Sequence, residues 1–121
     1  MLHISEHCRY FLFRHATDMR KSFHGLAAIV ATNMKKDVLN GDMYIFISKR
    51  RNAIKLLQFQ GDGFAIFYKH LEKGTFELPP AADACHTIQT TSNELLCILK
   101  GIALGQVKYR PRYAHNDPAG C

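Results

Sequence analysis

The chain has 121 residues and a mass of 13.8 kDa, which fits one domain, and 47% of its residues are hydrophobic, enough to build a core. Its apolar runs are far shorter than the roughly 18 residues of a membrane-spanning helix, and its first residues are too polar for a signal peptide, so we expect no membrane segment and a cytoplasmic location. Sixteen Lys and Arg residues against ten Asp and Glu residues leave a net charge of +6, which favours a polyanionic partner over an acidic substrate.

The first third of the chain predicts one strand and one helix. A short apolar and aromatic run between Arg9 and Arg14 is typical of a buried strand. Thr17 and Asp18 carry side chains that can cap a helix, and apolar residues then recur at helical spacing. This pattern predicts a helix over residues 19–34.

The middle of the chain predicts a β-hairpin. After the Asn-Gly-Asp turn at residues 40–42, aromatic and β-branched residues predict a strand over residues 43–48. Residues 54–59 resume the same pattern. We therefore expect a hairpin whose basic tip is formed by residues 49–52.

The second half of the chain predicts two further strands and a helix. A strand is expected over residues 64–71, and residues 75–78 are expected to pair with it before two prolines end the sheet. Residues 81–89 show little periodicity and are predicted to be a surface linker. A second helix is predicted from a cap at Thr91 to a stop at Gly101.

These elements together predict an α+β fold, a small antiparallel β-meander packed by one or two helices. We expect residues 1–106 to form a single domain. Residues 107–121 are too polar for a core and are predicted to be a basic, flexible tail. The oligomeric state stays open.

Several spaced motifs occur in one order along the chain, at residues 17–26, 46–52, 54–57, 61–64, 68–69, 71–72 and 74–76. In this order they resemble the TnpB accessory protein, encoded by the second reading frame, of the insertion sequence 66 transposon family. The resemblance covers about residues 4–78, with a weaker similarity near residues 94–101. One departure is that Phe59 and Gln60 stand where the family often has an acidic residue and a tryptophan or tyrosine.

The resemblance implies a part in transposition beside a separate, larger transposase. Together with the positive charge of the chain, it leads us to expect the transposase and DNA as partners. A second hypothesis stays open. The chain can instead be a protein–protein adaptor of the transposition complex that makes no direct contact with DNA.

Three groups of basic residues are the candidates for binding nucleic acid. The hairpin tip presents cations to phosphates, and the start of the first helix and the tail add more. The residues are Lys49, Arg50, Arg51 and Lys55 at the hairpin, Arg20 and Lys21 before the helix, and Lys108, Arg110 and Arg112 in the tail. The alternative for the tip is an ordinary solvated turn, and for Arg20 and Lys21 it is a local ion pair with Asp18.

The carboxylates do not predict a catalytic centre. Metal-dependent nucleases need carboxylates that converge on divalent cations. Each candidate here has a local role instead, Asp18 at a helix start, Asp42 and Asp62 in turns and Glu72 at a hairpin end. We therefore predict no enzymatic activity.

No cofactor or metal site is predicted either. His3, His7 and Cys8 lack a fourth ligand, and the four cysteines form no C-x-x-C motif. The glycines at residues 61–63 are not followed by a phosphate-binding lysine. Most aromatic residues are expected to fill the core, whereas Tyr109 and Tyr113 lie among basic residues of the tail, where they can contact a polyanion or a partner.

Overall fold

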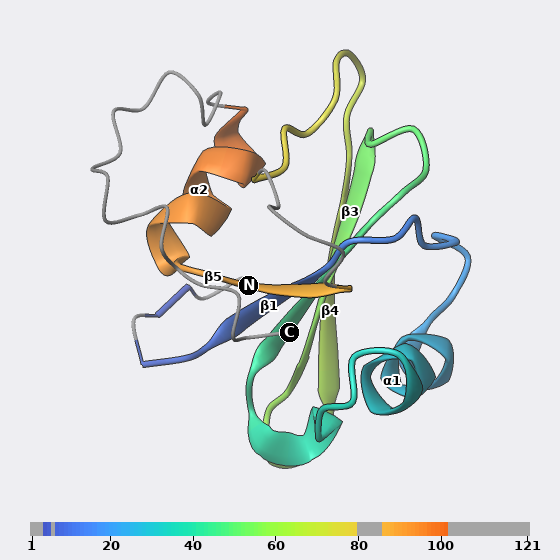
Figure 1. Ribbon diagram of the computed structural model, residues 1–121, viewed down its shortest axis with the longest axis vertical. Coiled ribbons are helices and arrows are strands. Elements are labelled where there is room, and N and C mark those ends of the chain that lie inside the picture. Colours follow the sequence, from blue (N-terminus) through green and yellow to red (C-terminus); the bar gives the residue numbers. More distant parts are fainter. Residues whose placement is uncertain (1–3, 6, 80–85, 102–121) are drawn as a thin grey trace.

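The computed structural model describes residues 4–5, 7–79 and 86–101, which form one sheet with helices on both of its faces (Figure 1). The elements in chain order are β1 (Tyr10–Phe13), α1 (Phe23–Thr32), a 3-10 helix η1 (Val38–Asn40), β2 (Met43–Ile47), β3 (Ala53–Phe59), β4 (Phe64–His70), β5 (Thr87–Thr90) and α2 (Ser92–Lys100). No helix in these described ranges has the length and apolar character needed to cross a membrane.

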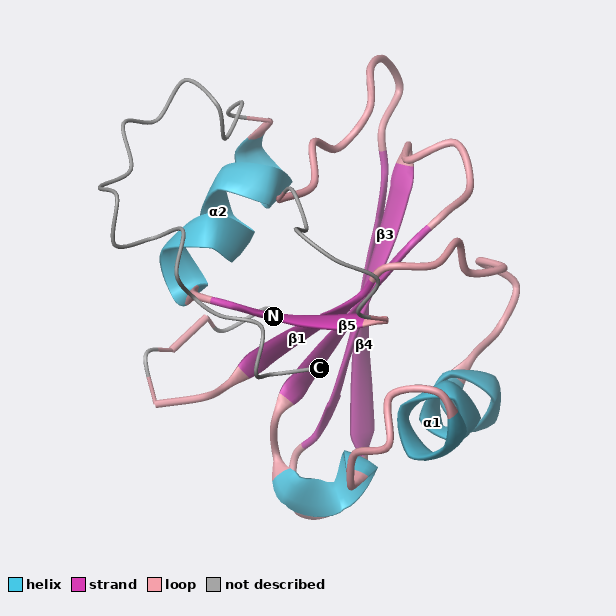
Figure 2. Cartoon of the chain, viewed as in Figure 1, coloured by secondary structure: helices cyan, strands magenta, loops and turns pink. Residues whose placement is uncertain are grey.

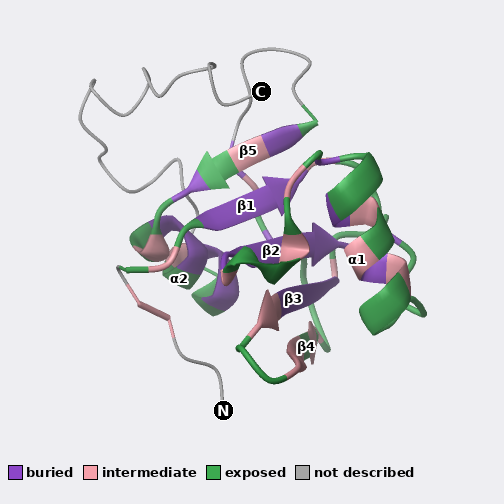
Figure 3. Cartoon of the chain, turned by 90° about the horizontal axis from the view of Figure 1, so that it is seen from below, coloured by how far each residue is buried: buried purple, intermediate pink, exposed green. Residues whose placement is uncertain are grey.

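The strands, magenta in Figure 2, lie in the order β4-β3-β2-β1-β5 (Figure 3). Strands β2, β3 and β4 follow one another as an antiparallel meander, which confirms the predicted fold class. Strand β1 is parallel to β2, because α1 carries the chain back across one face of the sheet between them. Strand β5 pairs antiparallel with β1 on its other side.

Two apolar cores lie on opposite faces of the sheet because side chains alternate along each strand. In β1, Tyr10 and Leu12 belong to the core under α2, whereas Phe11 and Phe13 belong to the core under α1. Every residue of β1 and β2 is buried, as expected for strands covered on both faces (Figure 3). This arrangement explains why these strands are continuous apolar runs in the sequence.

The first helix is shorter than predicted, because it begins at Phe23 instead of Met19. Asp18 accepts a hydrogen bond from the backbone N–H of Arg20 on its side chain and one from that of Lys21 on its backbone carbonyl. Asp18 thus closes a turn ahead of the helix instead of capping it.

Two other predictions for the second half of the chain were wrong. Residues 75–78 form no strand: Phe76 is buried in the core under α2, and its N–H bonds to the carbonyl of Arg51 instead of to β4. Residues 87–89, predicted to be linker, form β5 together with Thr90, because their backbone completes the hydrogen bonding of β1. Residues 81–85 and the predicted tail lie outside the described residues.

The second helix agrees with its predicted signals. The side chain of Thr91 accepts a hydrogen bond from the N–H of Glu94, and the carboxylate of Glu94 accepts one from the N–H of Thr91, a reciprocal capping box. Gly101 ends the helix with φ 78°, a left-handed conformation that glycine adopts without strain. Between these two ends, Leu95, Ile98 and Leu99 of α2 pack in the core under this helix.

Candidate nucleic-acid interface

Three loops gather at one end of the strands. They are residues 14–22 between β1 and α1, residues 48–52 between β2 and β3, and residues 71–78 after β4, and we call this surface the basic edge. Figure 1 shows the second and third loops side by side at the top of the sheet.

Backbone hydrogen bonds tie the three loops together. The N–H of Thr17 donates to the carbonyl of Ile47 at 2.9 Å, which holds the first loop to the end of β2. The N–H of Phe76 donates to the carbonyl of Arg51 at 2.6 Å, which holds the third loop to the second. The basic edge is therefore a surface assembled from segments far apart in the sequence.

Positive charge accumulates at the basic edge. Its three loops hold seven of the sixteen Lys and Arg residues of the chain, and only three of the ten Asp and Glu residues. The seven are Arg14, Arg20, Lys21, Lys49, Arg50, Arg51 and Lys73, and the three are Asp18, Glu72 and Glu77. This excess of four charges matches the net charge of residues 1–101 taken together.

The hairpin tip is exposed but conformationally fixed. Lys49, Arg50 and Arg51 are all exposed to solvent. Arg51 has φ 60°, a left-handed conformation that is uncommon for a residue with a side chain. Its N–H donates to the carbonyl of Ser48 at 2.9 Å, and the Oγ of Ser48 accepts from the N–H of Ala53 at 3.1 Å. The tip is thus a braced turn on the rim of the sheet.

Lys55 differs from the other predicted interface residues because it is buried. Its side chain lies on the α1 face of β3, where Nζ donates a 2.7 Å hydrogen bond to the carbonyl of Lys21 and lies 4.9 Å from the ring centre of Tyr68. The ammonium of Lys55 is therefore engaged within the protein. It holds the loop of residues 14–22 against the sheet.

Arg20 forms the local ion pair that the sequence offered as one explanation for it. Its guanidinium contacts the carboxylate of Asp18 through Nε and through Nη2, the latter at 2.8 Å. The hydrogen bonds from Arg20 lower the pKa of Asp18 to about 2, so this carboxylate is ionised at neutral pH. Arg20 itself is 91% exposed, so the pair lies open on the basic edge.

The candidate carboxylates are divided between the two ends of the sheet. Asp18 and Glu72 belong to the basic edge, whereas Asp42 precedes β2 and Asp62 lies in the β3–β4 turn at the opposite end. These four carboxylates therefore do not converge. Within the part of the chain that the structure describes, no three His, Cys, Asp or Glu side chains are grouped closely enough to hold a metal ion.

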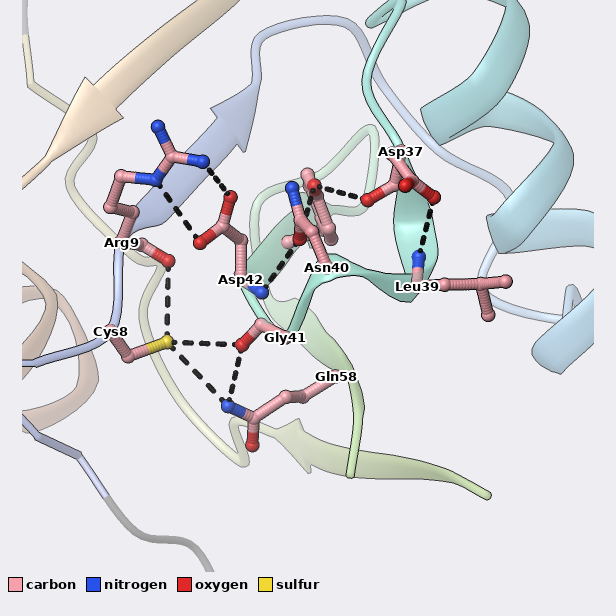
Figure 4. A network of polar contacts seen from close by, with 9 residues as sticks. Cys8, Arg9, Asp37, Leu39, Asn40, Gly41, Asp42 and Gln58 are labelled. Carbon is pink, nitrogen blue, oxygen red and sulfur yellow. Dashed lines mark hydrogen bonds and ion pairs between the residues drawn. The ribbon is translucent and has the colours of Figure 1, made fainter. Parts of the chain in front are cut away.

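A polar network at that opposite end gives Asp42 a structural role (Figure 4). Its carboxylate accepts hydrogen bonds from Nε and Nη2 of Arg9, at 3.2 and 2.8 Å, and these link the start of β1 to the start of β2. The amide of Gln58 donates to the carbonyl of Gly41 at 3.0 Å, and the thiol of Cys8 donates to the same carbonyl. Burial raises the pKa of the Cys8 thiol, which keeps it protonated.

Sequence reasoning missed two members of the basic edge. Arg14 and Lys73 are isolated basic residues in the sequence, and only the pairing of the strands brings them near the tip. No local motif marks them. The predicted residues Lys108, Arg110 and Arg112 lie outside the described residues.

Comparison with known proteins identifies the family. The family model described as "IS66 Orf2 like protein" matches residues 8–109, most of the chain. The chain belongs to the IS66 Orf2-like family. Membership confirms the resemblance noted in the sequence and indicates an accessory role in transposition of an insertion sequence, in a family that is generally non-catalytic.

Two relatives of this IS66 Orf2-like chain come from Sinorhizobium fredii. The uncharacterized protein y4jC is 27% identical over 111 residues, which cover 92% of this chain and 93% of the relative. The uncharacterized protein y4hO is 29% identical over 102 residues, which cover 84% and 87%. No solved structure matches the chain.

Some of the motif segments that carry the family resemblance lie at the basic edge, whereas residues 54–57 lie within β3, residues 61–64 include the β3–β4 turn at the opposite end of the sheet, and residues 68–69 lie within β4. Residues 17–26, 46–52 and 71–76 all contribute to the basic edge or to the element that directly follows it. Part of the IS66 Orf2-like signature thus coincides with the concentration of positive charge.

Proposed function

We propose that the basic edge binds DNA during transposition, and that the protein assists a separate transposase without catalysing strand cleavage itself. The observation that supports this proposal best is the charge distribution. Three loops that are distant in sequence converge on one edge and hold seven basic residues against three acidic ones. Phosphate groups are the ligands that such a surface favours.

The geometry of the basic edge favours contacts with the phosphate backbone of DNA over recognition of its bases. Lys49 and Arg50 project from a braced turn on the rim of the sheet, and Lys21 and Arg20 lie in the neighbouring loop. Flexible cations on a rigid rim can follow a phosphate backbone, and such contacts position a protein on DNA without specifying a sequence. We therefore expect sequence preference to come from the transposase or from the assembled complex.

A binding assay with charge-matched variants tests the proposal. The variant Lys49→Ala/Arg50→Ala removes two cations from the basic edge. The control Lys35→Asn/Lys100→Ala removes two exposed cations from elsewhere, and asparagine at position 35 tolerates the φ of 57° found there. Duplex DNA carrying the terminal repeats of the element is the probe.

We expect the first variant to bind this DNA about tenfold more weakly or worse at low salt, and the control to bind nearly as well as the wild type. A different outcome would indicate a protein–protein adaptor: the wild-type chain captures the transposase after nuclease treatment, but neither the wild type nor the control variant binds DNA. Strand cleavage by the purified chain that disappears in Asp62→Ala or Glu72→Ala protein would contradict the non-catalytic role.

A further inference from the structure

Strand β4 forms one edge of the sheet, and β3 is its only strand neighbour among the described residues. At one end of the pair the N–H of Leu71 donates to the carbonyl of Asn52, and at the other the carbonyl of Gly63 accepts from the N–H of Gln60. Odd-numbered residues therefore direct their backbone groups toward β3. Because this direction alternates along an antiparallel strand, the even-numbered residues direct theirs outward.

The outward edge of β4 lacks the features that commonly protect an edge strand. Proteins block such edges with proline, bulges or charged side chains. Strand β4 contains no proline, and its register with β3 is unbroken from the Ala53–His70 pair to the Phe59–Phe64 pair. Lys69 donates from Nζ to the carbonyl of Leu99 at 2.9 Å, so its charge is turned to the end of α2.

We propose that β4 pairs with β4 of a second copy of the chain, antiparallel and centred on Phe67. In this register Phe67 faces its own counterpart, Ile66 faces Tyr68, and Phe64 faces His70. All four outward-directed residues of each strand then lie in hydrogen-bonded pairs, so this register pairs every outward-directed backbone group from position 64 to position 70. The two five-stranded sheets become one continuous sheet.

The side chains of β4 fit a second copy as the occupant. Tyr68 is 50% exposed on the α1 face, and pairing places the apolar side chain of Ile66 from the other copy beside it. On the opposite face Lys69 lies across from Ala65, so no two like charges oppose each other. The same seven residues thus supply both halves of a compatible interface.

The pairing of the two β4 strands also determines where the two basic edges lie in the dimer. Antiparallel pairing reverses the strand direction between the copies, so the basic edges would lie at opposite ends of the joined sheet. On the function proposed above, such a dimer can contact two separate stretches of DNA at once.

Sedimentation of the full chain over a range of concentrations tests the dimer, with two variants at position 65. Ala65→Lys places an ammonium opposite Lys69 of the second copy, whereas Ala65→Glu places a carboxylate there. Each substitution occurs twice in the symmetric interface. We expect wild-type protein to sediment at twice 13.8 kDa at high concentration, Ala65→Lys to weaken the dimer by about two- to thirtyfold, and Ala65→Glu to preserve or strengthen it.

A second pair of variants separates backbone pairing from side-chain contact. Tyr68→Pro removes an outward N–H without removing a bond to β3, whereas Tyr68→Thr keeps that N–H. We expect monomers for the proline variant and a weaker dimer for the threonine variant. The proposal is overturned if wild-type protein stays monomeric at every concentration, if both charges at position 65 act alike, or if folded Tyr68→Pro protein still dimerises. These results do not depend on DNA binding, so they are distinct from a failure of the proposed function.

Discussion

The ammonium of Lys55 lies 2.7 Å from the backbone carbonyl of Lys21, and this hydrogen bond joins β3 to the loop that precedes α1. Lys55 is buried and Lys21 is exposed, although both are candidate nucleic-acid-binding residues in the sequence. Lys55 therefore helps to build the basic edge, whereas the side chain of Lys21 is exposed on its surface.

Lys55→Met should therefore lower the free energy of unfolding but have little effect on the affinity for DNA. The change keeps an apolar stem but leaves the carbonyl of Lys21 without its donor, which costs about 1.5–3 kcal/mol in the free energy of unfolding. Urea denaturation measures this loss. A drop in DNA affinity as large as that of Lys49→Ala/Arg50→Ala, in protein that is still folded, would contradict the expectation that Lys55 acts mainly on stability.

Asp18→Asn should strengthen DNA binding. At neutral pH the carboxylate of Asp18 is ionised, since its pKa is lowered to about 2, and it neutralises Arg20 on the exposed surface of the basic edge. The amide removes that charge and frees Arg20 for phosphate. We expect affinity for duplex DNA to rise about threefold to tenfold at low salt, as measured by fluorescence anisotropy. Unchanged affinity would exclude Arg20 from the contact surface.

Glu94→Gln should flatten the pH dependence of stability. Burial raises the pKa of Glu94 in the folded chain, so the folded state binds a proton more readily than the unfolded state does. The ionised carboxylate of Glu94 therefore destabilises the folded state at pH values above its folded pKa. This destabilisation disappears as the pH falls through that pKa. Glutamine keeps the capping box without the charge.

The gain in unfolding free energy of Glu94→Gln over wild type should accordingly be larger at pH 7 than at pH 4, in urea titrations at both values. A gain that is larger at pH 4 would mean that the folded state favours the ionised carboxylate.

The left-handed backbone at Arg51 predicts opposite effects for two substitutions. Valine is β-branched and strained at φ 60°, so Arg51→Val should destabilise the protein by about 1–2 kcal/mol. Glycine adopts this conformation freely, so Arg51→Gly should match or exceed the wild type in thermal unfolding. Equal losses for both variants would indicate that the side chain, not the backbone, stabilises the tip.

The sequence predicted the elements whose signals are local. Strands β2, β3 and β4 alternate or run apolar between clear turns, and α2 carries its cap at Thr91 and its stop at Gly101, so each agrees with its prediction to within a few residues. Strand β5 was missed because four residues with two buried threonines carry no periodic signal, and only pairing with β1 makes them a strand. Residues 75–78 were predicted to be a strand because Phe76 is apolar, but its side chain packs in the core under α2.

The interface was predicted in part for a related reason. Consecutive basic residues such as Lys49 and Arg50 are visible in a sequence, whereas Arg14 and Lys73 join them only through the strand order. The burial of Lys55 had a weak signal, since it lies between Ile54 and Leu56 in a strand that is covered on both faces. A cation in such a strand needs an acceptor, and the sequence does not identify which carbonyl supplies it.

The salt dependence of DNA affinity tests the central claim most directly. A phosphate contact contributes about 0.9 to the slope of log affinity against log salt concentration, so Lys49→Ala/Arg50→Ala should reduce that slope by about 1.8. The control Lys35→Asn/Lys100→Ala should leave it close to the wild-type value. Equal slopes for the wild type and the tip variant, or equal reductions in the tip variant and the control, would contradict a DNA-binding role for the basic edge.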